Sequence, residues 1–324
     1  MNMTSDLSAT QPQADQQAAL QAEAHPISAQ EFNFSASDGY TLCGRRYLPA
    51  KTTPIQAQVI VASATGVPQG FYRRFAEYLA RSGYAVLCFD YRGIGASAPP
   101  SLKGFEMSYL DWGRLDLSAA IDAMYDPTLP LFLVGHSYGG QALGLTRNHD
   151  KVTACYTFGT GAGWSGYMPL PERLKIDVIW NLVFPVMALK DGYIAWSKFN
   201  MGEDLPMGVY RQWRKWCKSP EYFFADQDLA ELHDQYAQVK TPIYAATALD
   251  DDWALPLSRH AFMKYYRNAP MQYIDFQAQD FALKKIGHMG YFKKDAVAIW
   301  DQLLQIFATY RPASANSATH QRQD

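Results

Sequence analysis

The stretch 130–140, which reads Pro-Leu-Phe-Leu-Val-Gly-His-Ser-Tyr-Gly-Gly, constrains the fold of this 324-residue chain more than any other feature. A short apolar run enters a Gly-x-Ser-x-Gly pattern, which predicts a buried strand that turns at Ser137 directly into a helix. Glycine at positions 135 and 139 would let the strand and the helix approach closely. Such a turn lifts the Ser137 hydroxyl clear of a sheet, within reach of a base. The alternative is a glycine-rich turn in which Ser137 only fills space.

The composition narrows the kind of protein. A chain of this length can bury a large core, so we expect one catalytic domain with an insertion rather than two independent domains. Its 29 basic and 31 acidic residues give a formal charge of -2, which argues against nucleic acid or an anionic membrane as a partner. Four cysteines are scattered without Cys-x-x-Cys spacing, and we expect them to be reduced core residues; they are Cys43, Cys88, Cys155 and Cys217.

No targeting or membrane segment is predicted. The first lysine or arginine is Arg45, and residues 1–44 contain no apolar stretch of the kind found in signal peptides, which indicates a cytoplasmic location. The longest apolar stretch, 178–189, is interrupted by Asn181 and Pro185. It is far shorter than the roughly 20 residues that a membrane helix needs.

The remaining pattern predicts an α/β fold with a mostly parallel central sheet flanked by helices. An Asp-Gly turn at 38–39 joins two alternating runs, which indicates an antiparallel hairpin at an edge. Apolar, β-branched runs then alternate with helical spacing, as in parallel sheets with crossover helices. The expected strands after the hairpin are 58–62, 84–89, 131–134, 152–158, 242–249 and 271–276, and the main helices are 71–82, 112–124, 256–268 and 291–309.

Residues 90–97, Asp-Tyr-Arg-Gly-Ile-Gly-Ala-Ser, follow a predicted strand. We interpret them as a tight structural loop, because the Gly-x-Gly-x-x-Gly pattern of a phosphate cradle is absent.

Residues 159–238 interrupt the strand pattern with many tryptophans and prolines. We expect a helical lid inserted between two parts of a core, 30–158 and 239–311, with disordered tails at 1–29 and 312–324. The rigid aromatic side chains favour a lid that shapes a substrate pocket, so that changing Trp213 or Trp216 would alter substrate preference more than stability. The alternative is a helical subdomain that only stabilises the core.

A serine hydroxyl needs an adjacent base, and the base needs a partner that fixes its tautomer. His288 lies in a glycine-flanked loop after the last predicted strand, where it could reach Ser137. We expect His136 to pack or to form hydrogen bonds locally, because adjacent side chains on a sharp turn diverge. The other histidines fall in predicted tails (His25, His320) or in helical patterns (His149, His233, His260).

Three consecutive carboxylates, Asp250, Asp251 and Asp252, follow a predicted strand and precede His288 in sequence. Like charges at that spacing raise each other's pKa, so all three cannot be buried against one imidazole. We expect one to bind the imidazole while the others face solvent or backbone amides. The spacing alone does not separate them.

The chain order Ser, Asp, His, together with the motifs at 90–97, 135–139, 250–252 and 286–288, resembles the α/β-hydrolase family over about residues 31–310. Segments 64–69, 202–206 and 287–292 are similar to a bacterial subgroup grouped with serine aminopeptidase S33-like sequences. The resemblance implies an α/β-hydrolase fold with Ser137 as nucleophile and His288 as base. It implies Asp251 as the acid, with Asp252 as the alternative.

The resemblance also implies an oxyanion hole made by the backbone N–H of Tyr138 and one from the loop after the first parallel strand. The family's usual His-Gly is replaced here by Ser63-Ala64-Thr65-Gly66, so the second donor is Thr65 or Ala64.

Together these features predict a cytoplasmic serine hydrolase that cleaves a small carboxylic ester through an acyl-enzyme. Amide or peptide cleavage and acyl transfer use the same groups, and a non-catalytic ligand-binding protein is the alternative from another class. A dehalogenase is disfavoured because its nucleophile is an aspartate where Ser137 stands. No metal or organic cofactor is expected, because ligand-type residues do not cluster. The sequence does not indicate an oligomeric state.

Overall fold

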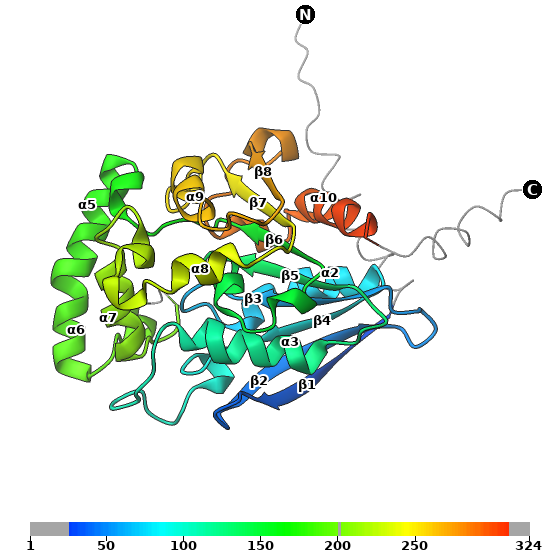
Figure 1. The fold of residues 1–324 in the computed structure, drawn as a ribbon, viewed down its shortest axis with the longest axis horizontal. Helices are drawn as coiled ribbons and strands as arrows, with labels where there is room; N and C mark the ends of the chain where they lie inside the picture. The colour runs from blue at the N-terminus through cyan, green and yellow to red at the C-terminus, as the bar shows by residue number, and fades with distance from the viewer. Residues whose placement is uncertain (1–25, 200–201, 311–324) are drawn as a thin grey trace, which may run out of the picture.

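The computed structural model describes residues 26–199 and 202–310 (Figure 1). The predicted tails, 1–29 and 312–324, lie outside these ranges except for residues 26–29. There the predicted boundary is wrong, because the first strand begins at Ile27 and pairs along its whole length, with Ile27 opposite Pro49.

Eight strands in the described residues form one sheet with the order β1-β2-β4-β3-β5-β6-β7-β8. Their bounds are β1 Ile27–Ser35, β2 Thr41–Pro49, β3 Ala57–Ala62, β4 Tyr84–Phe89, β5 Leu131–His136, β6 Ala154–Phe158, β7 Ile243–Ala248 and β8 Met271–Phe276. The β1-β2 hairpin is antiparallel and pairs antiparallel with β4, whereas all other neighbours pair in parallel. The predicted α/β class and the edge hairpin are confirmed.

Helices cover both faces of the sheet (Figure 1). On one face, α2 (Arg73–Arg81) and α10 (Val297–Ala308) pack against the side of β3 that carries Val59 and Val61. On the other face, where Ile60 points, the core includes α3 (Ser118–Met124), α8 (Leu232–Ala237) and α9 (Pro256–Met263). The central strands are therefore apolar on both sides, which explains their continuous apolar runs.

Two helices are shorter than expected. The predicted helix 256–268 ends at Met263, and in place of the predicted 291–309 there is a short 3₁₀ turn, Gly290–Phe292, followed by α10 from Val297.

Residues 90–97 form the structural loop that the sequence predicts. The Asp90 carboxylate accepts hydrogen bonds from the backbone N–H groups of Gln69 (2.7 Å) and Ala96 (3.0 Å). Arg92 is buried and forms ion pairs with Asp38 (2.6 Å) and Asp116 (2.7 Å). The charged side chains of the loop are thus engaged in contacts within the protein. Through the ion pair of Arg92 with Asp38, the loop connects the end of β4 to the edge hairpin.

The segment between β6 and β7 is helical. It contains α5 (Leu170–Val178), a π-helical turn (Ile179–Val183), α6 (Phe184–Asp191) and α7 (Met207–Trp216), and Figure 1 shows these helices to one side of the sheet. Trp180 stacks on Tyr210 (ring centroids 6.0 Å apart) and meets Trp213 edge-on (4.9 Å), so aromatic contacts hold the π-helical turn between α5 and α6 against α7.

Over the described ranges, the chain contains no helix with the length and apolar character that crossing a bilayer requires. All four cysteines are unpaired, as predicted. Cys88 and Cys155 are buried, but Cys43 and Cys217 are partly exposed, so the prediction that all four are core residues is wrong for these two.

Candidate active site

The sequence-predicted site residues follow the strands of one sheet edge. Thr65 follows β3, Ser137 follows β5, Asp251 follows β7 and His288 lies in the loop after β8. Because these strands are parallel, their carboxyl ends meet at the same edge. Residues separated by more than 200 positions in the sequence are thereby brought together.

Ser137 lies on a sharp turn between β5 and α4 (Tyr138–Gln141). Its backbone has φ 51° and ψ -112°, an unfavourable conformation for a residue with a side chain. A Cβ added to Gly139 would lie 2.0 Å from the carbonyl oxygen of Ala62, and one added to Gly135 would lie 2.4 Å from the Cα of Gly140. The two glycines are therefore required by the close approach of strand and helix, as the sequence predicts.

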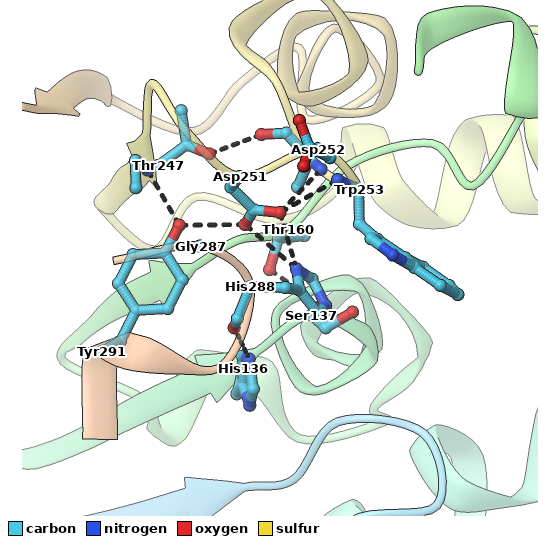
Figure 2. Close-up of polar contacts among 12 residues, drawn as sticks. His136, Ser137, Thr160, Thr247, Asp251, Asp252, Trp253, Gly287, His288 and Tyr291 are labelled. Carbon is cyan, nitrogen blue, oxygen red and sulfur yellow. Dashed lines mark hydrogen bonds and ion pairs between the residues drawn. The ribbon is translucent and has the colours of Figure 1, made fainter. Parts of the chain in front are cut away.

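The His288 ring is oriented by Asp251. Its Nδ1–H donates to both carboxylate oxygens of Asp251, at 3.0 Å each, and the Trp253 indole stacks on the ring at 5.9 Å (Figure 2). An ionised carboxylate only accepts hydrogen bonds, so the proton of a neutral His288 lies on Nδ1 and Nε2 has a free lone pair. That nitrogen can act as a base.

Asp251 is fully buried and satisfied by several donors. Besides His288, it accepts hydrogen bonds from the Tyr291 hydroxyl (3.0 Å) and from the backbone N–H groups of Trp253 (3.0 Å) and Ala254 (3.1 Å). Burial alone would raise the pKa of this carboxyl, but the charge of a protonated His288 and these hydrogen bonds outweigh burial and hold the pKa below its usual value. The carboxylate is thus kept ionised.

The three consecutive aspartates have three different surroundings. Only Asp251 contacts His288. Asp250 accepts hydrogen bonds from the backbone N–H groups of Ile286 (2.9 Å) and Gly287 (2.8 Å), and so it fixes the loop that leads to His288. Asp252 has a side chain that is 41% exposed and lies 3.6 Å from Lys285. One carboxylate against the imidazole, one on backbone amides and one in solvent is the division expected from the sequence.

Ser137 and His288 line the same two cavities, and Figure 2 shows the serine side chain beside the imidazole ring. Within residues 26–199 and 202–310, neither the Ser137 hydroxyl nor Nε2 of His288 has a hydrogen-bond partner. Both groups are therefore free to meet a substrate.

The two candidate donors after β3 differ in availability. The Ala64 N–H donates to the Tyr72 hydroxyl at 2.9 Å, whereas the Thr65 N–H has no acceptor among the described residues. Thr65 and Tyr138 line the same cavity as Ser137, and the Thr65 hydroxyl is hydrogen-bonded to the hydroxyl of Tyr109. Ala64 is already engaged, so the Thr65 and Tyr138 N–H groups remain as the candidate pair.

His136 packs among aromatic side chains, as one part of our expectation has it, but its hydrogen bonds are not local. Its Nε2–H donates to the backbone carbonyl of His288 at 2.8 Å (Figure 2), and the Tyr72 hydroxyl donates to its Nδ1 at 2.8 Å. The ring is fully buried, and burial, followed by repulsion from a protonated His288, lowers the pKa of His136 to about 3. A sharp turn does separate adjacent side chains, but here it sends His136 toward a loop 152 residues away.

The two cavities at Ser137 differ in size. A narrow chamber of about 30 Å³ is lined by Tyr109, Trp180, Trp213 and Tyr222, among others. A wider chamber of about 270 Å³ shares Trp213 and is lined by further residues, which include Val67, Trp196 and Met289. Trp216 lines neither chamber, because its indole donates to Asp226 (2.9 Å) and stacks on Tyr109 (5.8 Å). The two tryptophans that the sequence treats alike therefore have different surroundings.

The remaining histidines that the structure describes, His149, His233 and His260, line neither chamber, and His25 and His320 lie outside the described residues. In the described part of the chain, no group of histidine, cysteine and carboxylate side chains is arranged to hold a metal ion.

Two residues that support the site, Tyr72 and Tyr291, were not among the candidates that the sequence predicts. Tyr291 lies three residues after His288 in the motif at 287–292, and that proximity was the available signal. Tyr72 lies in the 3₁₀ turn Gln69–Tyr72, and nothing in its local sequence connects it with His136.

The sequence model of the alpha/beta hydrolase family matches residues 59–298, which is most of the chain. The chain belongs to the alpha/beta hydrolase family, and this membership supports hydrolysis as its general activity. One curated relative, Esterase FrsA of Yersinia enterocolitica, is 31% identical over 74 residues. That match covers 22% of this chain and only 18% of FrsA.

Solved structures with the same fold cover nearly the whole described chain. A soluble variant of monoglyceride lipase from Saccharomyces cerevisiae has a TM-score of 0.64 and 15% identity, and the match covers 87% of this chain and 95% of the lipase. Esterase Pf2001 of Pyrococcus furiosus has a TM-score of 0.56 and 13% identity, and the match covers 88% of this chain and 92% of the esterase. Hypothetical protein PA2218 of Pseudomonas aeruginosa has a TM-score of 0.57 and 17% identity, and the match covers 87% of this chain and 94% of PA2218. At these identities the likeness establishes the fold.

The low pKa of His136 predicts how stability depends on pH. Below pH 6.5 an unfolded chain binds a proton at this histidine, whereas the folded protein does not until about pH 3. The free energy of unfolding should therefore decrease as the pH is lowered from 6.5 toward 3, and this group contributes up to about 1.4 kcal/mol per pH unit to the decrease. A His136→Gln variant should lack that part of the slope. Urea unfolding at several pH values between 7 and 4.5 measures both slopes, and equal slopes would contradict the prediction.

Proposed function

We propose that this chain is a serine hydrolase that cleaves small carboxylic esters through an acyl-enzyme intermediate. The observation that carries the proposal is the arrangement at the carboxyl edge of the sheet. The Ser137 hydroxyl, unpaired among the described residues, lies beside His288, whose ring is oriented by the buried Asp251. The backbone N–H groups of Tyr138 and Thr65, which have no acceptor in the part of the chain that the structure describes, belong to residues that line the same cavity.

In the proposed reaction, Ser137 Oγ attacks the ester carbonyl carbon while its proton moves to Nε2 of His288. The carbonyl oxygen becomes an oxyanion, which accepts hydrogen bonds from the N–H groups of Tyr138 and Thr65. Asp251 stabilises the imidazolium and holds its orientation. The leaving alkoxide then takes the proton from His288, and the acyl group remains on Ser137.

The second half of the reaction repeats these roles with water. His288 takes a proton from water as the water oxygen attacks the acyl-enzyme, and it returns a proton to Ser137 Oγ when the acid leaves. Each oxyanion donor contributes roughly 10²- to 10³-fold in rate, so both halves depend on the loop that carries Thr65.

The sizes of the two chambers support a small substrate. The narrow chamber of about 30 Å³ has room for about two or three water molecules, at roughly 10–15 Å³ each, which limits the acyl chain to a few atoms. His288, which must protonate the leaving oxygen, lines both chambers, so the difference between them is their size. We therefore assign the acyl group to the narrow chamber and the alcohol to the wider one.

The alternatives have less support. An aminopeptidase must compensate the charge of a substrate amine, yet neither chamber is lined by a carboxylate among the described residues. A ligand-binding protein has no need for Asp251, whose burial carries a desolvation cost that the contact with His288 explains. An ester hydrolase accounts for both observations.

The nucleophile is tested by labelling. We expect a fluorophosphonate probe to label the wild-type protein at Ser137, because the probe reacts with activated serines. Ser137→Ala should lose labelling and turnover of p-nitrophenyl acetate together, while its thermal unfolding stays close to that of the wild type. Turnover that persists in the folded variant would refute the proposed function.

The acid is tested by comparing neighbouring aspartates. Asp251→Asn should lower kcat by roughly 10³- to 10⁴-fold, because the amide no longer fixes the His288 tautomer or stabilises the imidazolium. Asp252→Asn is the matched control, since the exposed carboxylate contributes little through its distant pairing with Lys285. Steady-state kinetics with p-nitrophenyl acetate measure both. A larger loss in Asp252→Asn than in Asp251→Asn would exchange their roles.

The acyl chamber is tested by a chain-length series of esters. Trp213→Ala should enlarge the narrow chamber and shift the ratio of kcat/KM for hexanoate over acetate by about tenfold or more. Trp216→Phe should instead lower the melting temperature and leave that ratio unchanged, because Trp216 lines neither chamber. If both variants lose activity equally toward every ester, the aromatic helices only stabilise the core.

A further inference from the structure

The buried ring of His136 is not used by the proposed reaction, although it lies directly before the nucleophile. It is fully buried among aromatic side chains, with the ring of Phe292 at 5.0 Å and that of Phe71 stacked at 6.5 Å. Its centroid is 5.2 Å from that of His288. A polar ring in such surroundings is costly unless both nitrogens are hydrogen-bonded, and both are.

The directions of these hydrogen bonds can be assigned. The backbone carbonyl of His288 can only accept, so Nε2 of His136 carries the proton and Nδ1 has a lone pair. The Tyr72 hydroxyl must then donate to Nδ1 (2.8 Å), and the same oxygen accepts the N–H of Ala64 (2.9 Å). One continuous chain of hydrogen bonds thus runs from the loop after β3, through Tyr72 and His136, to the loop after β8.

The two ends of this chain adjoin the reacting groups. Ala64 precedes Thr65, whose N–H is the candidate oxyanion donor, and the other end is the carbonyl of His288 itself. Asp250 holds the two residues before His288, but the His288 carbonyl is held by His136. The chain also passes through the residue next to Ser137.

We propose that His136 and Tyr72 are positioning residues that set the spacing between the base His288, the nucleophile Ser137 and the oxyanion donor Thr65. This inference rests on the proposed function. The three groups lie on three separate loops, and a displacement of about 1 Å in such an arrangement can cost about 10²-fold in rate.

An imidazole suits this role because its acceptor and its donor lie on opposite sides of one rigid ring. With a pKa of about 3, the ring stays neutral over the range in which an ester hydrolase would work, so both hydrogen bonds persist there.

The test compares two buried tyrosines. Tyr72→Phe removes the hydroxyl that joins the two loops and keeps the ring. Tyr266→Phe is the matched control, because the Tyr266 hydroxyl also accepts a backbone N–H, from Gly144 (3.0 Å), and donates to a backbone carbonyl, of Gln141 (3.1 Å). Both side chains are nearly or fully buried, so both variants lose comparable contacts.

We expect Tyr72→Phe to lower kcat for p-nitrophenyl acetate by roughly 10- to 100-fold. Its KM should stay near the wild-type value, because Tyr72 lines neither chamber. Tyr266→Phe should lose stability to a similar extent in urea and keep its kcat. Equal kcat values in the two variants would overturn the proposal, because Tyr72 would then be merely structural.

A second pair of variants covers the case in which Tyr72→Phe does not fold. His136→Gln places an amide N–H near the position of Nε2 and should keep the hydrogen bond to His288, whereas His136→Leu cannot. We expect the glutamine variant to retain most of its kcat and the leucine variant to lose it with KM unchanged. Equal losses in both would overturn the proposal.

Amide hydrogen exchange separates this inference from the proposed function. If the wild-type protein neither turns over esters nor reacts with the fluorophosphonate, the proposed function fails, but the chain of hydrogen bonds can still be tested. Tyr72→Phe should then speed exchange at the N–H groups of Ile286 and Gly287 relative to Tyr266→Phe. Unchanged exchange at these two positions would overturn the coupling between the loops.

Discussion

The strained turn at Ser137 is the constraint on which the arrangement of the site depends. The chain reverses from β5 into α4 so tightly that Gly139 contacts the carbonyl of Ala62, at the end of β3. This contact brings the loop after β3, with the Thr65 N–H, against the nucleophile. The Ser137 backbone is held in place by its own hydrogen bonds, in which its N–H donates to the Phe158 carbonyl and its carbonyl accepts the Thr160 hydroxyl. Strain that is fixed from both sides in this way is typical of functional sites.

A second constraint is the buried carboxylate of Asp251. An ionised group without exposure to water is unstable unless donors surround it, and here His288, Tyr291 and two backbone N–H groups do so. The Tyr291 hydroxyl also accepts the N–H of Ala248, so the same network ties the end of β7 to the loop after β8. The network that keeps Asp251 charged therefore also fixes the position of the base.

The fold and two of the site residues could be predicted from sequence because their signals are local. Alternating apolar runs and helical spacing predict the parallel sheet, and the glycines around Ser137 identify the turn within five residues. His288 could be found because it lies in a glycine-flanked loop after the last strand. The predicted helix ends were less accurate, as in α9, which ends at Met263 rather than at residue 268. Tertiary contacts influence where a helix ends as much as the propensities of its residues do.

The sequence by itself determined the class of fold and the edge of the sheet where the polar residues gather, and it singled out Ser137 and His288 as candidates. Only the tertiary structure shows that Asp251, rather than Asp250 or Asp252, contacts His288, since three identical neighbours differ solely in what surrounds them. The same holds for His136, whose partners lie 64 and 152 residues away, and for Trp213 and Trp216, which share one helix but face different neighbours. Burial and hydrogen bonding depend on segments that are distant in the chain, so a local sequence pattern does not predict them.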